Sequence, residues 1–397
     1  RGNKNSAQSS KDEDELEYDR RKEQRMKDLI AACFSDIHLA HKANDTLSII
    51  RMLETEIFEK KLLDKIDILF LAGDTFDRLI QLDYPYLPDI DAFAAKLIRE
   101  CELKNVILRI MEGTPSHDRR QPERFKTIFE IIHSNADFAY VDTLRIEYIA
   151  KYDAHVLYIP DEWKADNDET LQEVKALMAS KGLEQVDIAV MHGQFSYQMP
   201  AHIKGLPIHD AEAYQKLVRT VIFIGHVHTH SRYGKIVAQG SFDRLRHGEE
   251  EAKGYVIARI KNNGVTISFI ENKAARIYKT IELYDLDITE SMSKIETALK
   301  GQPMDICLRI EAEIDHPIFV NVGQLEKRFP TVTFSKLPKD RTTGESINLV
   351  VHNEFDDWKG ITITKENIID LVMERISTDE FTAPEHSYMR AQLKELT

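Results

Sequence analysis

The sequence predicts an α/β fold, because short apolar runs alternate with amphipathic segments along most of the chain. Residues 46–61, 90–100 and 170–180 carry apolar side chains at helical spacing and are expected to cover the faces of a sheet. The apolar runs between them are predicted strands. Five of these runs end in a residue that can bind metal or transfer a proton, at the place where the ligand crevice of α/β sheets lies.

The five runs and the polar residues that follow them come in a fixed order. They are 29–34 with Asp36 and His38, 68–72 with Asp74, 106–111 with Ser116, His117 and Asp118, 188–191 with His192, and 221–224 with His226 and His228. Alternate residues that leave a strand point to the same side, so the last two histidines can face one object. Scattered structural histidines would not share this position, and a common site at the strand ends is therefore expected.

Later apolar runs predict a second, antiparallel sheet packed on the first. Its strands are expected at 235–238, 255–260 and 265–270, with a turn at Asn262-Asn263-Gly264. A small α+β domain should follow, with a helix at 289–300, a strand at 306–314, a helix near 320–329 and a strand at 331–334. Residues 336–345 are the expected linker.

The chain divides into four predicted segments. They are a polar tail or cloning remnant at 1–25, a large domain at 26–278, the small domain at 279–345 and C-terminal helices within 346–397. Residues 364–376 form an amphipathic helix candidate with Thr364 as a possible N-cap, and 387–397 form another. Little core remains to receive them, so packing on their own domain and docking on a partner are both open.

Composition limits the class of protein. The 397 residues carry a formal net charge of −14, which argues against a free-standing basic nucleic-acid module but not against an enzyme that acts on nucleic acid. No apolar run approaches a membrane span, and the charged N-terminal residues are unlike a secretion signal. Three scattered cysteines form no disulfide framework. A cytoplasmic location is expected.

Divalent metal is the simplest explanation for this gathering of donors. Mixed imidazole and carboxylate ligands suit Mn, Fe or Zn better than Ca, with Mg as a poorer substitute. The number of donors exceeds what one ion needs, so two ions are expected, with Asp74 as the bridge. His117 is predicted to stabilise transition-state charge or to protonate the leaving group, and Asp118 to orient it.

The ordered motifs resemble those of the calcineurin-like metallophosphoesterases. They are Asp36-Ile37-His38, Gly73-Asp74-Thr75-Phe76-Asp77, Ser116-His117-Asp118, His192-Gly193 and Gly225-His226-Val227-His228. The segment from Gly240 to Tyr255 is similar to one in the SbcD-type subunits of DNA double-strand-break nucleases, the small subunits of bacterial and phage recombination endonucleases. The resemblance extends over about residues 26–275.

This resemblance implies a two-sheet metallophosphoesterase sandwich flanked by helices, with a small α+β cap domain that faces DNA and C-terminal helices that dock a partner. It implies one manganese held by Asp36, His38, Asp74 and His228. The other would be held by Asp74, His192, His226 and an asparagine. Here Ser116 stands where the asparagine is expected, and a hydroxyl is a weaker ligand, so retained activity with a raised manganese requirement is expected.

The activity that the resemblance implies is manganese-dependent 3′-to-5′ exonuclease action on DNA ends and endonuclease action on single strands or hairpins. The implied partners are an SbcC-type coiled-coil ATPase and a second copy of the chain, in a bacterial or phage-infected cell. Asp77 and Arg244 are candidates for contact with the DNA backbone, or for a structural ion pair.

Two other functions stay open. The same dinuclear site can serve a phosphodiesterase or phosphatase on substrates other than DNA, which the acidic charge favours. A scaffold whose metal site has decayed is the alternative from another class, and only Ser116 supports it, because the other expected ligands are all present.

Overall fold

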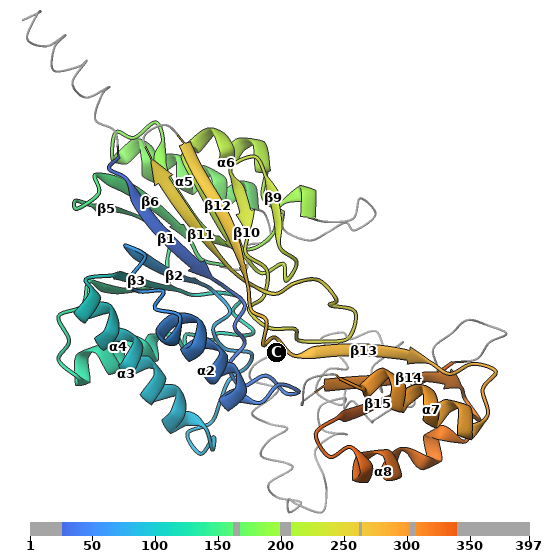
Figure 1. Ribbon diagram of the computed structural model, residues 1–397. Helices are drawn as coiled ribbons and strands as arrows, with labels where there is room; N and C mark the ends of the chain where they lie inside the picture. Colours follow the sequence, from blue (N-terminus) through green and yellow to red (C-terminus); the bar gives the residue numbers. More distant parts are fainter. Residues whose placement is uncertain (1–25, 162–166, 199–207, 262–263, 302–305, 340–397) are drawn as a thin grey trace, which may run out of the picture. The chain divides into compact units, whose positions relative to one another are not determined.

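The computed structural model describes residues 26–161, 167–198, 208–261, 264–301 and 306–339. Two six-stranded sheets form the centre of the fold (Figure 1). The tail at 1–25 and the helices predicted within 346–397 lie outside the described residues. Among the described helices, none is both long and apolar enough to span a membrane.

The first sheet has the order β12-β11-β1-β2-β3-β4. Strands β1 to β4 are parallel, and β11 joins β1 antiparallel, with Cys33 opposite Val256. The strands are β1 (Leu29–Phe34), β2 (Ile68–Ala72), β3 (Ile107–Met111), β4 (Phe138–Val141), β11 (Gly254–Lys261) and β12 (Gly264–Glu271).

The second sheet has the order β5-β6-β7-β8-β10-β9, and its four central strands are parallel. The edge strands β5 and β9 pair antiparallel with their neighbours. The strands are β5 (Arg145–Ile149), β6 (Ala154–Ile159), β7 (Val186–His192), β8 (Val218–Gly225), β9 (Ser231–Tyr233) and β10 (Ile236–Ala238).

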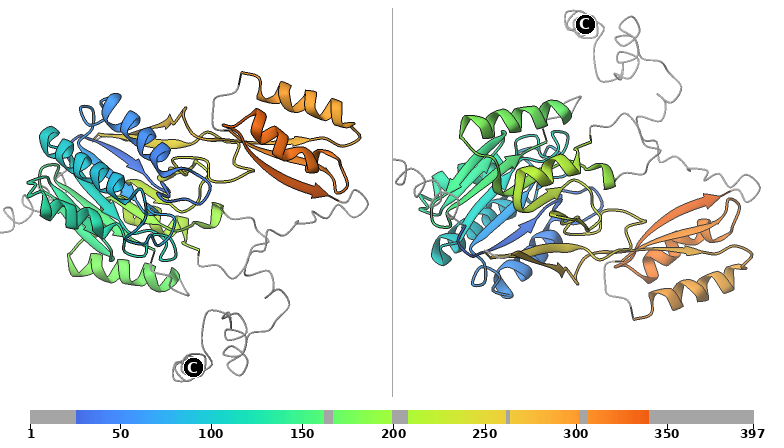
Figure 2. Two further views of the ribbon diagram at one scale, coloured as in Figure 1. Left: turned by 90° about the horizontal axis from the view of Figure 1, so that it is seen from below. Right: turned by 90° about the horizontal axis from the view of Figure 1, so that it is seen from above.

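Helices cover the outer face of each sheet, which gives four layers. The first sheet is covered by α2 (Thr46–Glu54) with its π-helical extension η1 (Thr55–Glu59), α3 (Leu87–Lys104) and α4 (Glu123–Ile131). The second is covered by α5 (Asn167–Ser180) and α6 (Ala211–Leu217), and the short 3₁₀ helix η2 (Ser196–Gln198) follows β7. The blue and cyan helices and the green helices lie on opposite sides of the strands (Figure 2).

Strand alternation explains the layering. In β1, Ala31 and Cys33 face the second sheet, whereas Ala32 and Phe34 face the helices. In β2, Phe70 likewise packs between the sheets against Tyr158 and Phe223. Strands that are buried on both faces are continuously apolar, as the sequence shows for these runs.

The predicted two-sheet α/β architecture is confirmed, but the predicted make-up of the second sheet is wrong. The hairpin β11-β12 extends the first sheet, because Val256, Ala258 and Ile260 of β11 pack in the core between the sheets. The strand at 236–238 joins the second sheet beside β8. The other strands of the second sheet come from residues 145–233, and of these β5, β6 and β9 were not predicted.

A third sheet of three strands has the order β13-β14-β15, with helices α7 (Ile288–Leu299) and α8 (Ile318–Arg328) between its strands in the chain. Its strands are β13 (Ile277–Glu282), β14 (Ile306–Glu313) and β15 (Thr333–Lys339). The predicted linker at 336–345 begins inside β15, because an edge strand tolerates Pro338. The domain boundaries at 278 and 345 stay predictions.

Candidate metal centre

The candidate ligands come from the carboxyl ends of strands in both sheets. Asp36 and His38 follow β1, and Asp74 follows β2, whereas His192 ends β7, and His226 and His228 follow β8. The sequence predicted one sheet edge, but the structure joins two. Four of the residues have left-handed backbone, with φ of 51° at Asp36, 53° at His38, 49° at Asp74 and 94° at His226. Such strain costs about 1–3 kcal/mol per residue and gathers at functional sites.

Glycines permit the close approach of these strand ends. A Cβ on Gly225 would lie 2.6 Å from the Ala72 carbonyl oxygen and 2.8 Å from His192 Nδ1. A Cβ on Gly73 would lie 2.2 Å from the same nitrogen, and one on Gly113 would lie 2.1 Å from the Asp74 nitrogen. The motif glycines therefore let the two sheets bring their ligands together.

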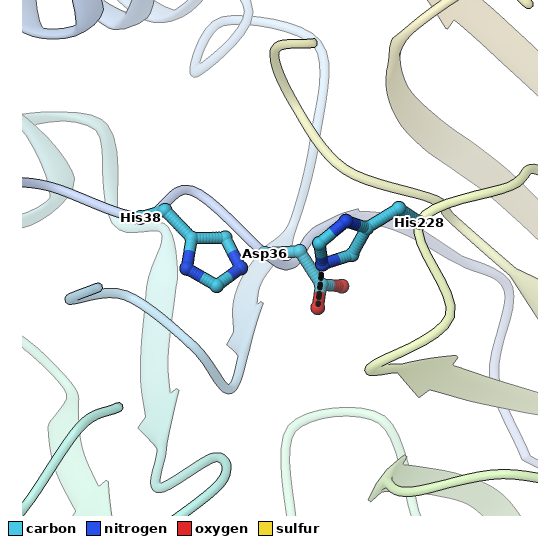
Figure 3. A group of neighbouring side chains, drawn as sticks. All are labelled: Asp36, His38 and His228. Atoms are coloured by element: carbon cyan, nitrogen blue, oxygen red, sulfur yellow. Dashed lines mark ion pairs between the residues drawn. The ribbon is translucent and has the colours of Figure 1, made fainter. Parts of the chain in front are cut away.

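Asp36, His38 and His228 form the first donor set (Figure 3). His228 Nε2 lies 3.7 Å from Asp36 Oδ1, and the rings of the two histidines are 5.2 Å apart. Asp36 is fully buried and is held by the Ser35 hydroxyl and by the backbone nitrogen of His226. The three side chains offer one carboxylate and two imidazoles to a common centre.

The His38 ring gives a test of whether this set fits a metal. The side chain is 1% exposed, and within the described part of the chain neither ring nitrogen has a hydrogen-bond partner. Its Nδ1 approaches Asp77 Oδ1 at 3.3 Å without hydrogen-bond geometry. Unpaired polar atoms at this depth are costly, and a metal ion bound at one ring nitrogen would remove the cost for that atom. The donor chemistry therefore fits a divalent ion.

Asp74, His192 and His226 form the second donor set. The His192 ring donates from Nδ1 to the Ala72 carbonyl at 2.9 Å, which turns its Nε2 to within 3.3 Å of Asp74 Oδ1. Asp74 Oδ2 also lies 3.9 Å from His38 Nε2. Asp74 thus has a carboxylate oxygen near each set, and its role as a bridge between two ions stays a prediction.

Electrostatics in the second set is dominated by one carboxylate between buried rings. Burial lowers the pKa of His192, but the Asp74 carboxylate outweighs this and raises that pKa to about 10. Burial raises the pKa of Asp74, but His192, His38 and His117 outweigh it and hold that pKa far below its usual value. The site is therefore a strong attractor for positive charge, whether proton or metal.

Thr114, rather than Ser116, lies among the second set. Its hydroxyl oxygen is 3.1 Å from Asp74 Oδ2, 3.2 Å from His226 Nδ1 and 3.3 Å from His192 Nε2. Its backbone nitrogen also donates to Asp74 Oδ1 at 2.6 Å. These separations match donors that surround a common ion at about 2.1 Å, which lie roughly 3 Å apart. Ser116 instead accepts a hydrogen bond from Arg119 at its backbone carbonyl.

His117 lines a cavity beside both sets. Its Nδ1 donates to the Asp77 carbonyl oxygen at 2.6 Å, and its ring meets the edge of His38 at a centroid distance of 5.0 Å. The cavity has a volume of about 770 Å³, and its lining includes His38, His41, Asp77, His117, His226 and His228. The Asp77 carbonyl, rather than a carboxylate, fixes the ring of His117.

Asp118 has a role that differs from the predicted one. It is fully buried and accepts from the backbone nitrogens of Phe76 at 2.8 Å and Gly113 at 2.7 Å, and no hydrogen bond to His117 is present among the described residues. Burial and the nearby Asp74 carboxylate raise the pKa of Asp118. Asp118 therefore ties together the loops that carry Asp74 and His117 instead of orienting the imidazole.

The two candidates for DNA contact lie differently. The Asp77 carboxylate faces the cavity, 3.3 Å from His38 Nδ1 and 4.0 Å from His41 Nε2. Arg244 is half-buried and directs its guanidinium to the backbone carbonyls of Ala275, Arg276 and Glu250 at 3.3–3.5 Å. Its DNA contact stays a prediction, whereas its contacts within the chain are structural.

Sequence reasoning missed three polar residues of this region. They are Thr114, Glu249 and Lys253, of which the last two contact His228. Thr114 could have been found from its position directly after Gly113, whose backbone lies so close to Asp74 that no side chain fits between them. Glu249 and Lys253 lie in the segment from Gly240 to Tyr255 that carries the resemblance, but nothing in their sequence spacing predicted that they contact His228.

Comparisons with known proteins add little. No protein-family model matches the chain, and no curated protein sequence is significantly similar to it. Among solved structures, TT1561 of Thermus thermophilus has a TM-score of 0.37 and 13% identity, with 61% of this chain and 99% of that chain covered. A second crystal structure has a TM-score of 0.38 and 12% identity, with coverage of 61% and 100%. Likenesses of this size assign no substrate or activity.

Proposed function

We propose that the chain is a manganese-dependent nuclease of the calcineurin-like metallophosphoesterase class, which cleaves phosphodiester bonds in DNA. Two neighbouring donor sets carry this proposal. They are Asp36-His38-His228 and Asp74-His192-His226, and Asp74 of the second set also lies 3.9 Å from His38 of the first. A site of imidazoles and carboxylates with this arrangement suits two ions such as Mn²⁺, with Mg²⁺ as a poorer substitute.

Two bound ions would clamp the phosphate, activate water near neutral pH and neutralise charge that develops in the transition state. The chain's own groups complete the chemistry. His117 is fixed through Nδ1 by the Asp77 carbonyl, so its Nε2 can hold a proton on the cavity side and deliver it to the departing alkoxide oxygen. Asp118 keeps the His117 and Asp74 loops in register.

DNA is proposed as the substrate on two grounds. The cavity beside the donors opens onto residues 245–249 and 251, in the segment that resembles SbcD-type nuclease subunits. The chain also carries a small α+β region and a C-terminal segment beyond the sandwich. We propose these as the DNA-facing cap and the element that docks an SbcC-type ATPase, in a complex with two copies of this chain.

One rival activity has a specific observation in its favour. The formal net charge of −14 repels DNA at long range, which a phosphodiesterase or phosphatase on other substrates would not experience. A decayed scaffold fits less well, because Thr114 supplies an oxygen donor to the second set and all six ionisable candidate ligands are in place.

The experiment is a manganese-dependent cleavage assay on linear duplex and hairpin DNA, with and without a candidate ATPase partner. Wild type should cleave both substrates, and His117→Ala should lose activity while it retains metal. Cleavage of small phosphodiesters but never of DNA, even with the partner, would establish the rival activity instead.

A further inference from the structure

The segment between β10 and β11, residues 239–253, wraps around one candidate ligand, His228. Ser241 donates its backbone nitrogen to the His228 carbonyl at 3.1 Å, and Phe242 donates to the Asp36 carbonyl at 3.3 Å. Phe242 also packs against Phe34 at the end of β1. The segment therefore contacts both Asp36, which follows β1 of the first sheet, and His228, which follows β8 of the second sheet.

Glu249 contacts the His228 ring directly. Its Oε1 lies 3.3 Å from His228 Nδ1, on the opposite side of the ring from the Nε2 atom that faces Asp36. The Glu249 side chain is 8% exposed, and its other oxygen accepts from the Leu245 nitrogen at 3.1 Å. A carboxylate in this position keeps the proton of the neutral ring on Nδ1, so that the Nε2 lone pair points toward the metal site.

Lys253 holds both Glu249 and His228 in place. Its side chain is fully buried, and its ammonium group lies 3.0 Å from Glu249 Oε2, 2.7 Å from Glu251 Oε1 and 2.9 Å from the His228 carbonyl oxygen. An ammonium has three N–H donors, and these three partners use all of them. The lysine thus fixes the carboxylate relative to the backbone of the histidine it contacts.

The second donor set is held by different neighbours. His192 donates its Nδ1 proton to the neutral carbonyl of Ala72, whereas His228 faces a charged carboxylate. A carboxylate partner raises the basicity of a ligating imidazole more than a carbonyl does, and such partners typically change metal affinity by about 10- to 100-fold. The two sets should therefore differ in their dependence on residues outside them.

We propose that Glu249, held by Lys253, is a positioning residue that orients the His228 ring and selectively sets the affinity of the first donor set for its metal. This inference rests on the proposed metal centre and goes beyond it, because it assigns a role to the segment at 239–253 that neither the ligand set nor the cleavage reaction requires.

The test is calorimetric titration of the full chain with MnCl₂, without DNA. Glu249→Gln keeps the shape and the acceptor oxygen but removes the charge. It should weaken one of the two Mn²⁺ sites by about 10- to 100-fold and leave the other unchanged. The matched control is Glu250→Gln, which changes the exposed neighbour and should leave both sites as in wild type.

A double variant separates positioning from general electrostatics. Once His228 is replaced, Glu249 has no ring to orient, so His228→Ala with Glu249→Gln should bind Mn²⁺ as His228→Ala alone does. Additive weakening in the double variant, equal weakening of both sites by Glu249→Gln, or the same loss in Glu250→Gln would overturn the proposal.

A measurement on the unsubstituted chain keeps the test independent of folding of the variants. In the Mg²⁺-loaded chain, ¹⁵N shifts of the His228 ring should report a protonated Nδ1 and a metal-facing Nε2, and the opposite tautomer would refute the role of Glu249. The titrations test the role of Glu249, whereas the DNA assay tests the nuclease function, so either proposal can be refuted without the other. Wild type that binds two Mn²⁺ ions but never cleaves DNA would end the nuclease proposal and leave this one standing.

Discussion

At the scale of single residues, the site depends on a few side chains whose neighbours fix their orientation. His192 and His117 each donate from Nδ1 to a backbone carbonyl, and His228 faces a carboxylate. This arrangement turns Nε2 of His192 toward Asp74 and Nε2 of His228 toward Asp36, so both rings face the donor sets. Thr114 is the residue whose place the sequence did not reveal, because its hydroxyl reaches the second donor set through the turn that follows Gly113.

Replacement of Thr114 by alanine should weaken manganese binding at the second donor set by about tenfold, since one neutral oxygen donor among several is lost. Ser116→Ala serves as the control and should change nothing, because Ser116 is held through its backbone carbonyl rather than through its hydroxyl. Thr114→Asn should tighten the same site, because a carboxamide is a better ligand than a hydroxyl. Calorimetric titration measures all three, and an effect of Ser116→Ala equal to that of Thr114→Ala would contradict the assignment.

Replacement of His117 by alanine should lower kcat by about 10²- to 10⁴-fold with little change in manganese affinity, because the ring acts on the leaving group and lies outside both donor sets. Steady-state kinetics on a DNA hairpin and metal titration of the same preparation measure the two quantities. Loss of a metal site in this variant would show that His117 is a ligand, as its place beside His38 and Asp77 also permits.

At the scale of elements, the strand ends can meet because glycines occupy the positions where two segments of the backbone come close together, as at Gly225. Gly225→Ala would place a methyl group 2.6 Å from the Ala72 carbonyl and 2.8 Å from the Ser35 Cβ. We expect it to lower the free energy of unfolding by about 1–3 kcal/mol and to displace His192. Gly323→Ala, inside α8 and with open space around it, should instead stabilise by about 1 kcal/mol. Denaturant unfolding measures both, and equal effects would refute the packing argument.

A partly buried ion pair links the two sheets. Arg109 of β3 is 4% exposed and donates to both oxygens of Glu147 of β5, at 2.6 Å and 2.9 Å. Burial raises the pKa of Glu147, but the Arg109 guanidinium outweighs it and holds that pKa below its usual value. A carboxylate with a depressed pKa stabilises the fold above its unfolded pKa of about 4.3 and loses this effect as pH falls further.

Glu147→Gln should therefore lower the free energy of unfolding at pH 7 by about 1–3 kcal/mol, because buried Arg109 loses one of its two carboxylate partners and keeps only Asp137. The difference between variant and wild type should shrink as pH falls below about 4.3. Urea unfolding at a series of pH values measures it, and a difference that is constant between pH 7 and pH 3 would contradict the sign.

Much of the fold and of the site could be predicted from the sequence. The runs that became β1, β2, β7 and β8 are apolar on both faces, and the ligands follow them directly. The pairing of β11 with β1 could not be predicted, because a hairpin with Asn262-Asn263-Gly264 at its turn does not specify which sheet receives it. Likewise, β5 has an intermediate or exposed residue at three of its five positions, so its periodicity is weak.

At the scale of the whole molecule, the proposed complex assigns separate tasks to the sandwich and to the C-terminal segment. Deletion of residues 346–397 should abolish binding of the ATPase partner and leave both manganese sites intact, since every candidate ligand lies between residues 36 and 228. Co-purification and metal titration measure the two effects. Unchanged co-purification after the deletion would refute the docking role.

The central claim is that the strand ends of two sheets hold two metal ions. Anomalous diffraction from a crystal soaked in MnCl₂ tests it most directly. The account predicts two manganese peaks about 3.5–4 Å apart, one among Asp36, His38 and His228 and the other among Asp74, His192, His226 and Thr114, with Asp74 in contact with both. A single peak, or peaks away from these donors, would contradict it.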